Sequence, residues 1–117
     1  MPKVTFTGDA ELIRALDEDS EFPLTERTRQ NAVDQPTERM GFELGSVEIL
    51  VGHLAAGVHL YFIVEHLLKA ARSSKSPRLE ICSPMGRISV DLAGKSDKEV
   101  AALLKAALPF VRADEPA

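Results

Sequence analysis

The chain has 117 residues, enough for one domain with a modest core but not for two. Its formal net charge of −4 disfavours binding to nucleic acid, because attraction to the phosphate backbone needs a basic surface that releases counterions. The single cysteine, Cys82, excludes a disulfide or a CxxC metal site within the chain, so we expect a cytoplasmic protein.

The first residues predict a strand followed by a helix. Val4 and Phe6 alternate with polar residues, as in a half-buried strand, and this pattern differs from that of a secretory signal. Asp9 is a suitable N-cap for a helix over 9–18. We interpret the acidic residues 17–21 as a solvated turn instead of a metal site.

The next segment is polar and contains two prolines. We predict an extended edge strand over 24–33 and then a loop through Gly41.

Residues 46–73 contain few helix breakers and are strongly apolar, which favours one long helix. A helix that lies on one sheet needs an apolar stripe only a little over about 100° wide. This segment is apolar around most of its circumference, so we expect a second molecule to cover it. A membrane span over 47–64 is disfavoured, because Glu48, His53 and His59 interrupt the apolar run.

Alternating residues then predict a β-hairpin over 78–92. A four-residue loop, 83–86, pairs Ile81 with Ile88 and Leu79 with Val90, which makes one face apolar. Gly86 is expected to adopt a left-handed conformation in that loop.

The capping box Ser96–Glu99 begins a helix predicted over 96–108, which Pro109 ends. We therefore predict one α+β domain over 1–112 and a flexible tail over 113–117. The small, mostly antiparallel sheet comprises the N-terminal strand, the strand near 24–33 and the hairpin 78–92. It packs against the long central helix (46–73) and two shorter helices (9–18 and 96–108).

The sequence predicts no cofactor, no metal and no enzyme activity. His59 and His66 share a helix face but lie about 10 Å apart at seven residues' spacing, too far to bind one metal unaided. Cys82 is predicted opposite Arg87 in the hairpin, without a neighbouring base. Nucleotide-binding, hydrolase and zinc-protease motifs are absent from the sequence.

We therefore expect a protein that binds another protein, or a second copy of itself, through its long helix. The candidate interface residues are Leu54, Val58, His59, Tyr61, Phe62 and His66. The alternative is a small enzyme or ligand-binding protein that uses His59, His66 and Glu48.

Several segments resemble a known family, the first type of effector-associated constant component, found in actinobacterial conflict systems. They comprise 8–13, Met40-Gly41 ahead of 47–51, the apolar helix that ends in 71–76, and 79–91. The resemblance covers most of the chain. It implies a non-enzymatic adaptor that accompanies variable effector or peptidase modules of a multi-protein bacterial system and couples them to a sensor.

Overall fold

A computed structural model describes residues 2–31, 47–55, 57–75, 77–109 and 111. The fold is α+β, as predicted, with five strands and three helices. In chain order these are β1 (Lys3–Asp9), α1 (Ala10–Glu18), β2 (Leu24–Asn31), β3 (Val47–Leu54), α2 (Leu60–Ala71), β4 (Arg78–Ser83), β5 (Gly86–Asp91) and α3 (Asp97–Leu104).

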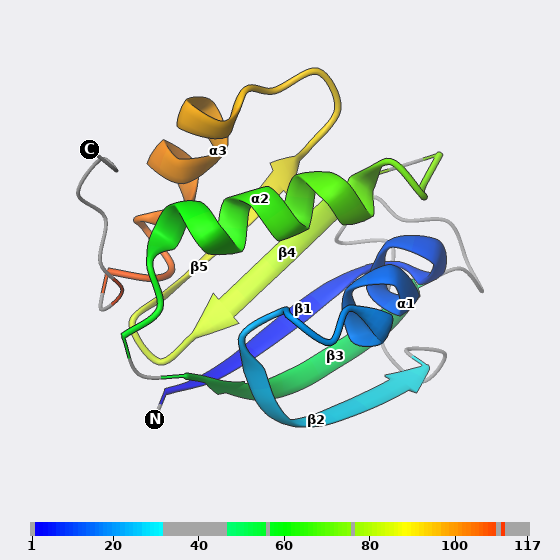
Figure 1. Ribbon diagram of the computed structural model, residues 1–117, viewed down its shortest axis with the longest axis horizontal. Helices are drawn as coiled ribbons and strands as arrows, with labels where there is room; N and C mark the ends of the chain where they lie inside the picture. The colour runs from blue at the N-terminus through cyan, green and yellow to red at the C-terminus, as the bar shows by residue number, and fades with distance from the viewer. Residues whose placement is uncertain (1, 32–46, 56, 76, 110, 112–117) are drawn as a thin grey trace.

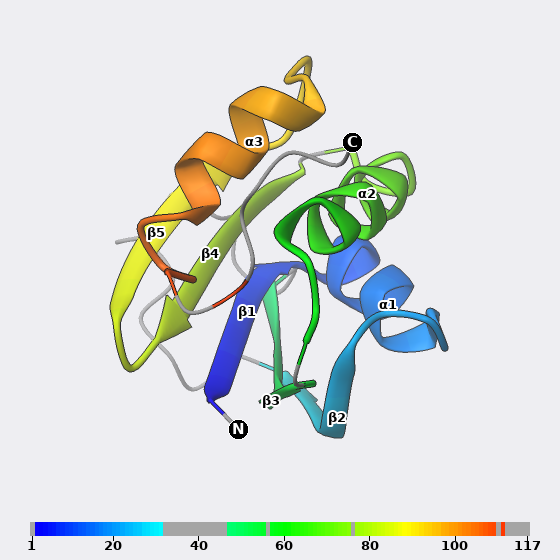
Figure 2. The ribbon, with the colours of Figure 1, turned by 60° about the vertical axis from the view of Figure 1, so that its left-hand side comes forward.

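The strands form one antiparallel sheet in the order β2-β3-β1-β4-β5, and the helices cover one of its faces (Figures 1 and 2). Phe6 on the central strand β1 is paired with Leu50 on one side and Ile81 on the other, and all three are fully buried. The predictions of β1, of α1 capped by Asp9, and of an edge strand that begins at Leu24 are confirmed.

The prediction of one helix over 46–73 is wrong. Val47–Leu54 forms β3, which lies between β2 and β1, and α2 begins only at Leu60. Gly57 lies between them with a φ of 80°, a conformation that favours glycine. Because β3 is largely buried on both faces, its apolar run lacks the alternation that distinguishes a half-buried strand from a helix.

The excess apolar surface expected of that helix is absent, because the chain buries most of it. Apolar residues of β3 and α2 lie in the core between sheet and helices, namely Leu50, Leu54, Leu60, Ile63, Val64 and Leu67. Val47 and Ile49 form a second buried cluster, on the strand face that points away from the helices. Within the described ranges, the structure has no helix long and apolar enough to cross a lipid bilayer.

The hairpin has the predicted pairs, including Leu79 with Val90 and Cys82 with Arg87, but a shorter loop. Ser83 pairs with Gly86, so only two residues form the turn, and Gly86 is not left-handed. The Met85 N–H donates to the Ser83 hydroxyl at 3.1 Å and stabilises this turn. Glycine is required at 86 because a Cβ there would lie 2.5 Å from the Ala106 carbonyl oxygen.

The capping box of α3 is confirmed, but the helix ends at Leu104 and not at 108. The N–H groups of Ala106 and Ala107 bond to carbonyls three residues back, which tightens the chain into a turn. This turn directs Ala107 and Leu108 into the core, where both are fully buried. Residues 32 and 33 of the predicted edge strand, the loop through Gly41 and the tail 113–117 lie outside the described residues.

Candidate functional site

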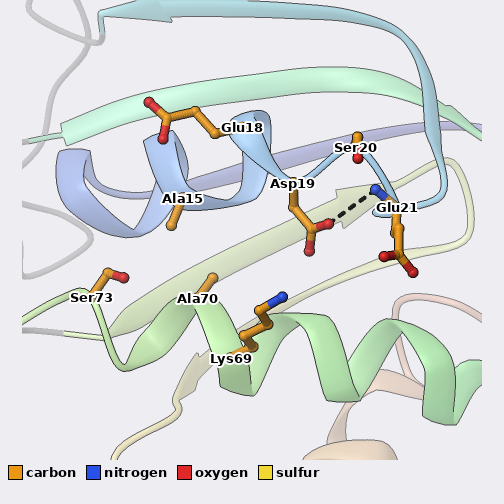
Figure 3. Close-up of a pocket in the computed structure, with 8 residues that line it drawn as sticks. All are labelled: Ala15, Glu18, Asp19, Ser20, Glu21, Lys69, Ala70 and Ser73. Carbon is orange, nitrogen blue, oxygen red and sulfur yellow. Dashed lines mark hydrogen bonds between the residues drawn. The ribbon is translucent and has the colours of Figure 1, made fainter.

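A cleft of about 440 Å³ lies between the end of α1 and the C-terminal end of α2 (Figure 3). It is lined by Ala15, Glu18, Asp19, Ser20, Glu21, Lys69, Ala70 and Ser73. Asp19 points towards α2, and the Lys69 amine points back towards the end of α1 (Figure 3). A second hollow of about 420 Å³ shares Glu21 and Lys69 with the first and is also lined by His66 and Arg72. We call the two hollows together the α1–α2 cleft.

The principal polar contact across this cleft joins Asp19 to His66. The Nδ1 atom of His66 forms a short hydrogen bond with Oδ2 of Asp19, and the two side chains are only 11% and 15% exposed. Phe62 packs edge-to-face on the His66 ring with a centroid distance of 4.5 Å, and Phe22 lies on another side at 6.4 Å. The imidazole is therefore fixed in orientation by a carboxylate and two aromatic rings.

The electrostatics of this site lower the pKa of Asp19. Burial alone would raise the pKa of this carboxyl, but the hydrogen bonds from His66 and from the Glu21 N–H, together with the charges of His66 and Lys69, outweigh that effect. The Glu21 N–H donates to Oδ1 of Asp19 at 3.0 Å. Asp19 is thus held as a carboxylate in the folded protein.

Arg27 holds the backbone around Asp19, and sequence reasoning missed it. Its Nη1 and Nη2 atoms donate to the carbonyl oxygens of Asp17 at 2.5 Å and Asp19 at 2.7 Å. It also donates to the carbonyls of Leu16, Phe22 and Leu24. The last carbonyls of a helix have no partner within the helix, and α1 has no basic residue in its last turn. The absence of a basic residue there is the available sequence signal.

Glu48, the carboxylate of the alternative enzyme hypothesis, lies elsewhere, on β3. Arg14 of α1 approaches its Oε2 at 2.8 Å, and Arg29 of β2 approaches its Oε1 at 3.4 Å. Glu48 is 7% exposed and is engaged by two permanent cations. His66 therefore pairs with Asp19 and not with Glu48.

The six predicted interface residues have different surroundings. Leu54 is buried in the core, whereas Val58 and Tyr61 are partly buried against it. His59 is the N-cap of α2, where its Nδ1 accepts the Tyr61 N–H at 3.2 Å. Phe62 is 37% exposed and borders His66. Of the six, His66 thus lines the cleft and Phe62 packs on it.

The described residues contain no group of three His, Cys, Asp or Glu side chains placed to hold a metal ion. Comparison with known proteins found no matching family model, no significantly similar curated protein and no similar solved structure. The resemblance to the effector-associated constant components stays a prediction.

Proposed function

We propose that the protein is a non-enzymatic adaptor that binds a partner protein through the outer face of α2 and the α1–α2 cleft. The partner is an effector or peptidase module of a multi-protein bacterial system, as the sequence resemblance implies. This proposal no longer depends on an apolar long helix, since the chain itself covers most of that surface.

The exposure of Phe62 beside a charged cleft is the observation that supports it best. An aromatic side chain that is 37% exposed offers an apolar anchor, and the packing of His66 beneath it restricts its motion. Glu18, Glu21 and Lys69 line the adjoining cleft and supply polar groups of both signs. An aromatic centre with a charged rim is a common composition of protein interfaces.

The test is binding to the purified products of neighbouring genes, measured by calorimetry with wild-type protein and Phe62→Ser. We expect the substitution to weaken binding by at least about tenfold, the loss typical of a central aromatic residue. Leu103→Ser is the matched control, because Leu103 is 41% exposed but lies on α3, and it should bind as the wild type does.

Equal losses in the two variants would place the interface elsewhere. Light scattering tests the homo-oligomer version of the proposal. A monomeric mass at micromolar concentration would contradict self-association, and the heterologous partner would be the remaining version.

The Asp19–His66 pair favours one alternative, a small enzyme or ligand-binding protein, with Asp19 in the role first assigned to Glu48. A carboxylate bonded to Nδ1 fixes an imidazole in the tautomer that a general base needs. Replacing His59 and His66 together by Gln should then abolish binding of a detected metal or small molecule. Retention of protein binding with no ligand found for the wild type would contradict this alternative.

A further inference from the structure

We infer that the Asp19–His66 contact is a proton-dependent latch, which holds the turn after α1 against α2 most tightly when the imidazole is charged. This inference concerns the conformation of the cleft and stands without the proposed function. Its consequence for partner binding rests on that function.

The two ends of α1 are tied by different chemistry, one to the turn after α2 and the other to α2 itself. At the start of α1, the Ser74 hydroxyl donates to Oδ2 of Asp9 at 3.0 Å. Beyond the end of α1, Asp19 contacts His66. A serine hydroxyl keeps its proton throughout the physiological range, whereas histidine ordinarily changes charge between pH 5 and 8. A change in the protonation of histidine near neutral pH therefore alters the Asp19–His66 contact and not the Asp9–Ser74 contact.

The surroundings of His66 contain more carboxylates than cations. Asp19 itself lies against the ring, and the hollow beside it is lined by three further carboxylates, Glu21, Glu65 and Asp97, from the turn, α2 and α3. Glu18 lines the neighbouring hollow. The opposing cations are Lys69, in the last turn of α2, and Arg72, its C-cap. A positive charge on the imidazole therefore lies among groups of mostly opposite sign.

When the imidazole is charged, the contact joins opposite charges, and Coulomb attraction adds to the hydrogen bond with the Asp19 carboxylate. Loss of the imidazole proton leaves a weaker N–H···O bond, so the turn carrying Asp19 opens more often. Arg27 limits the size of that opening, because it still holds the carbonyls on both sides of the turn. Since Phe62 packs on His66, opening would also release the anchor of the proposed interface.

Hydrogen exchange of backbone amides tests the latch. The Phe22 N–H donates to the Asp19 carbonyl within the turn, so its protection reports the opening. Relative to amides of β1, and after correction for intrinsic rates, we expect this protection to fall at least about threefold between about pH 5.5 and about pH 8. Asp19→Asn keeps the hydrogen-bonding shape without the charge and should remove the pH dependence.

Glu26→Gln is the matched control, since it removes the carboxylate of the His53 contact and should leave the pH dependence intact. Equal protection at both pH values in the wild type, or persistence of the effect in Asp19→Asn, would overturn the inference. If Asp19→Asn does not fold, the wild type provides the test. The chemical shifts of the Phe22 amide and the His66 ring should titrate with one midpoint, and different midpoints would also overturn the inference. Partner affinity does not enter these measurements, so they can fail independently of the proposed function.

Discussion

Two histidine–carboxylate pairs of the described residues lie on opposite sides of the sheet. Asp19–His66 lies on the helix side, with side chains 15% and 11% exposed. Glu26–His53 lies on the other side, where the side chains are 79% and 34% exposed and the closest atoms are 3.3 Å apart. The functional groups are alike, but only the first pair lies in a setting where its charge state can affect the fold.

The difference follows from how the backbone holds each carboxylate. Asp19 lies in a turn whose carbonyls are held by Arg27, and its carboxylate accepts a backbone N–H as well as bonding His66. Glu26 has a positive φ of 53° where the pairing of β2 with β3 becomes irregular. Burial and a fixed backbone, more than the residue types, distinguish a structural pair from a surface one.

Removing Arg27, which holds the turn around Asp19, should lower the free energy of unfolding more than any other change proposed here. Arg27→Met removes a donor from five carbonyl oxygens, of which those of Leu16, Asp19 and Phe22 keep a backbone N–H. We expect a loss of about 3 kcal/mol in the free energy of unfolding, measured by urea denaturation. Arg29→Met is the control on the same strand. Arg29 is 37% exposed and contacts carboxylates at 3.4 Å and 3.7 Å, so its loss should stay below about 1 kcal/mol. Equal losses would mean that the carbonyl contacts contribute little.

A third carboxylate, Glu48, has partners that keep their charge at every accessible pH. We expect Glu48→Gln to cost about 1.5 kcal/mol, because a buried carboxylate loses charge-assisted bonds while the exposed side of Arg14 stays solvated. A double-mutant cycle with Arg14→Met measures the coupling. A coupling energy near zero would show that Arg14 and Glu48 contribute independently to stability, contrary to the expectation from their geometry.

Acid titration tests the environment of Asp19. The pKa of Asp19 is lowered from its ordinary value of 3.8, so its carboxylate stabilises the folded state above that pH. This contribution is lost as pH falls through the lowered pKa. The difference in unfolding free energy between wild type and Asp19→Asn should therefore shrink on acidification below about pH 5. A difference that grows on acidification would show that burial dominates and that the pKa is raised.

Local signals in the sequence predicted much of the fold. The alternation around Phe6, the cap at Asp9, the pairing of Leu79 with Val90 and the capping box at Ser96 are each decided within a few residues. The identity of β3 is not decided locally. Its state depends on pairing with β1 and β2 and on two arginines that make Glu48 compatible with burial.

The candidate site was predicted only in part. His66 and Phe62 were among the candidates, but the partner of His66 lies 47 positions earlier in the chain, in a segment interpreted as a solvated turn. Charge alone cannot show which member of an acidic run faces a helix. The role of Arg27 was even less accessible, because its acceptors are backbone carbonyls, which every residue possesses.

The smallest expected effect concerns Glu26. Glu26→Gln removes the charge from the exposed pair and keeps the backbone conformation, so we expect a change in unfolding free energy below about 0.5 kcal/mol. Solvent already satisfies both groups, and salt screens their attraction. A loss as large as that of Asp19→Asn at neutral pH would contradict the distinction drawn between the two pairs. It would indicate that the irregular stretch of β2 needs the Glu26–His53 contact to maintain its register.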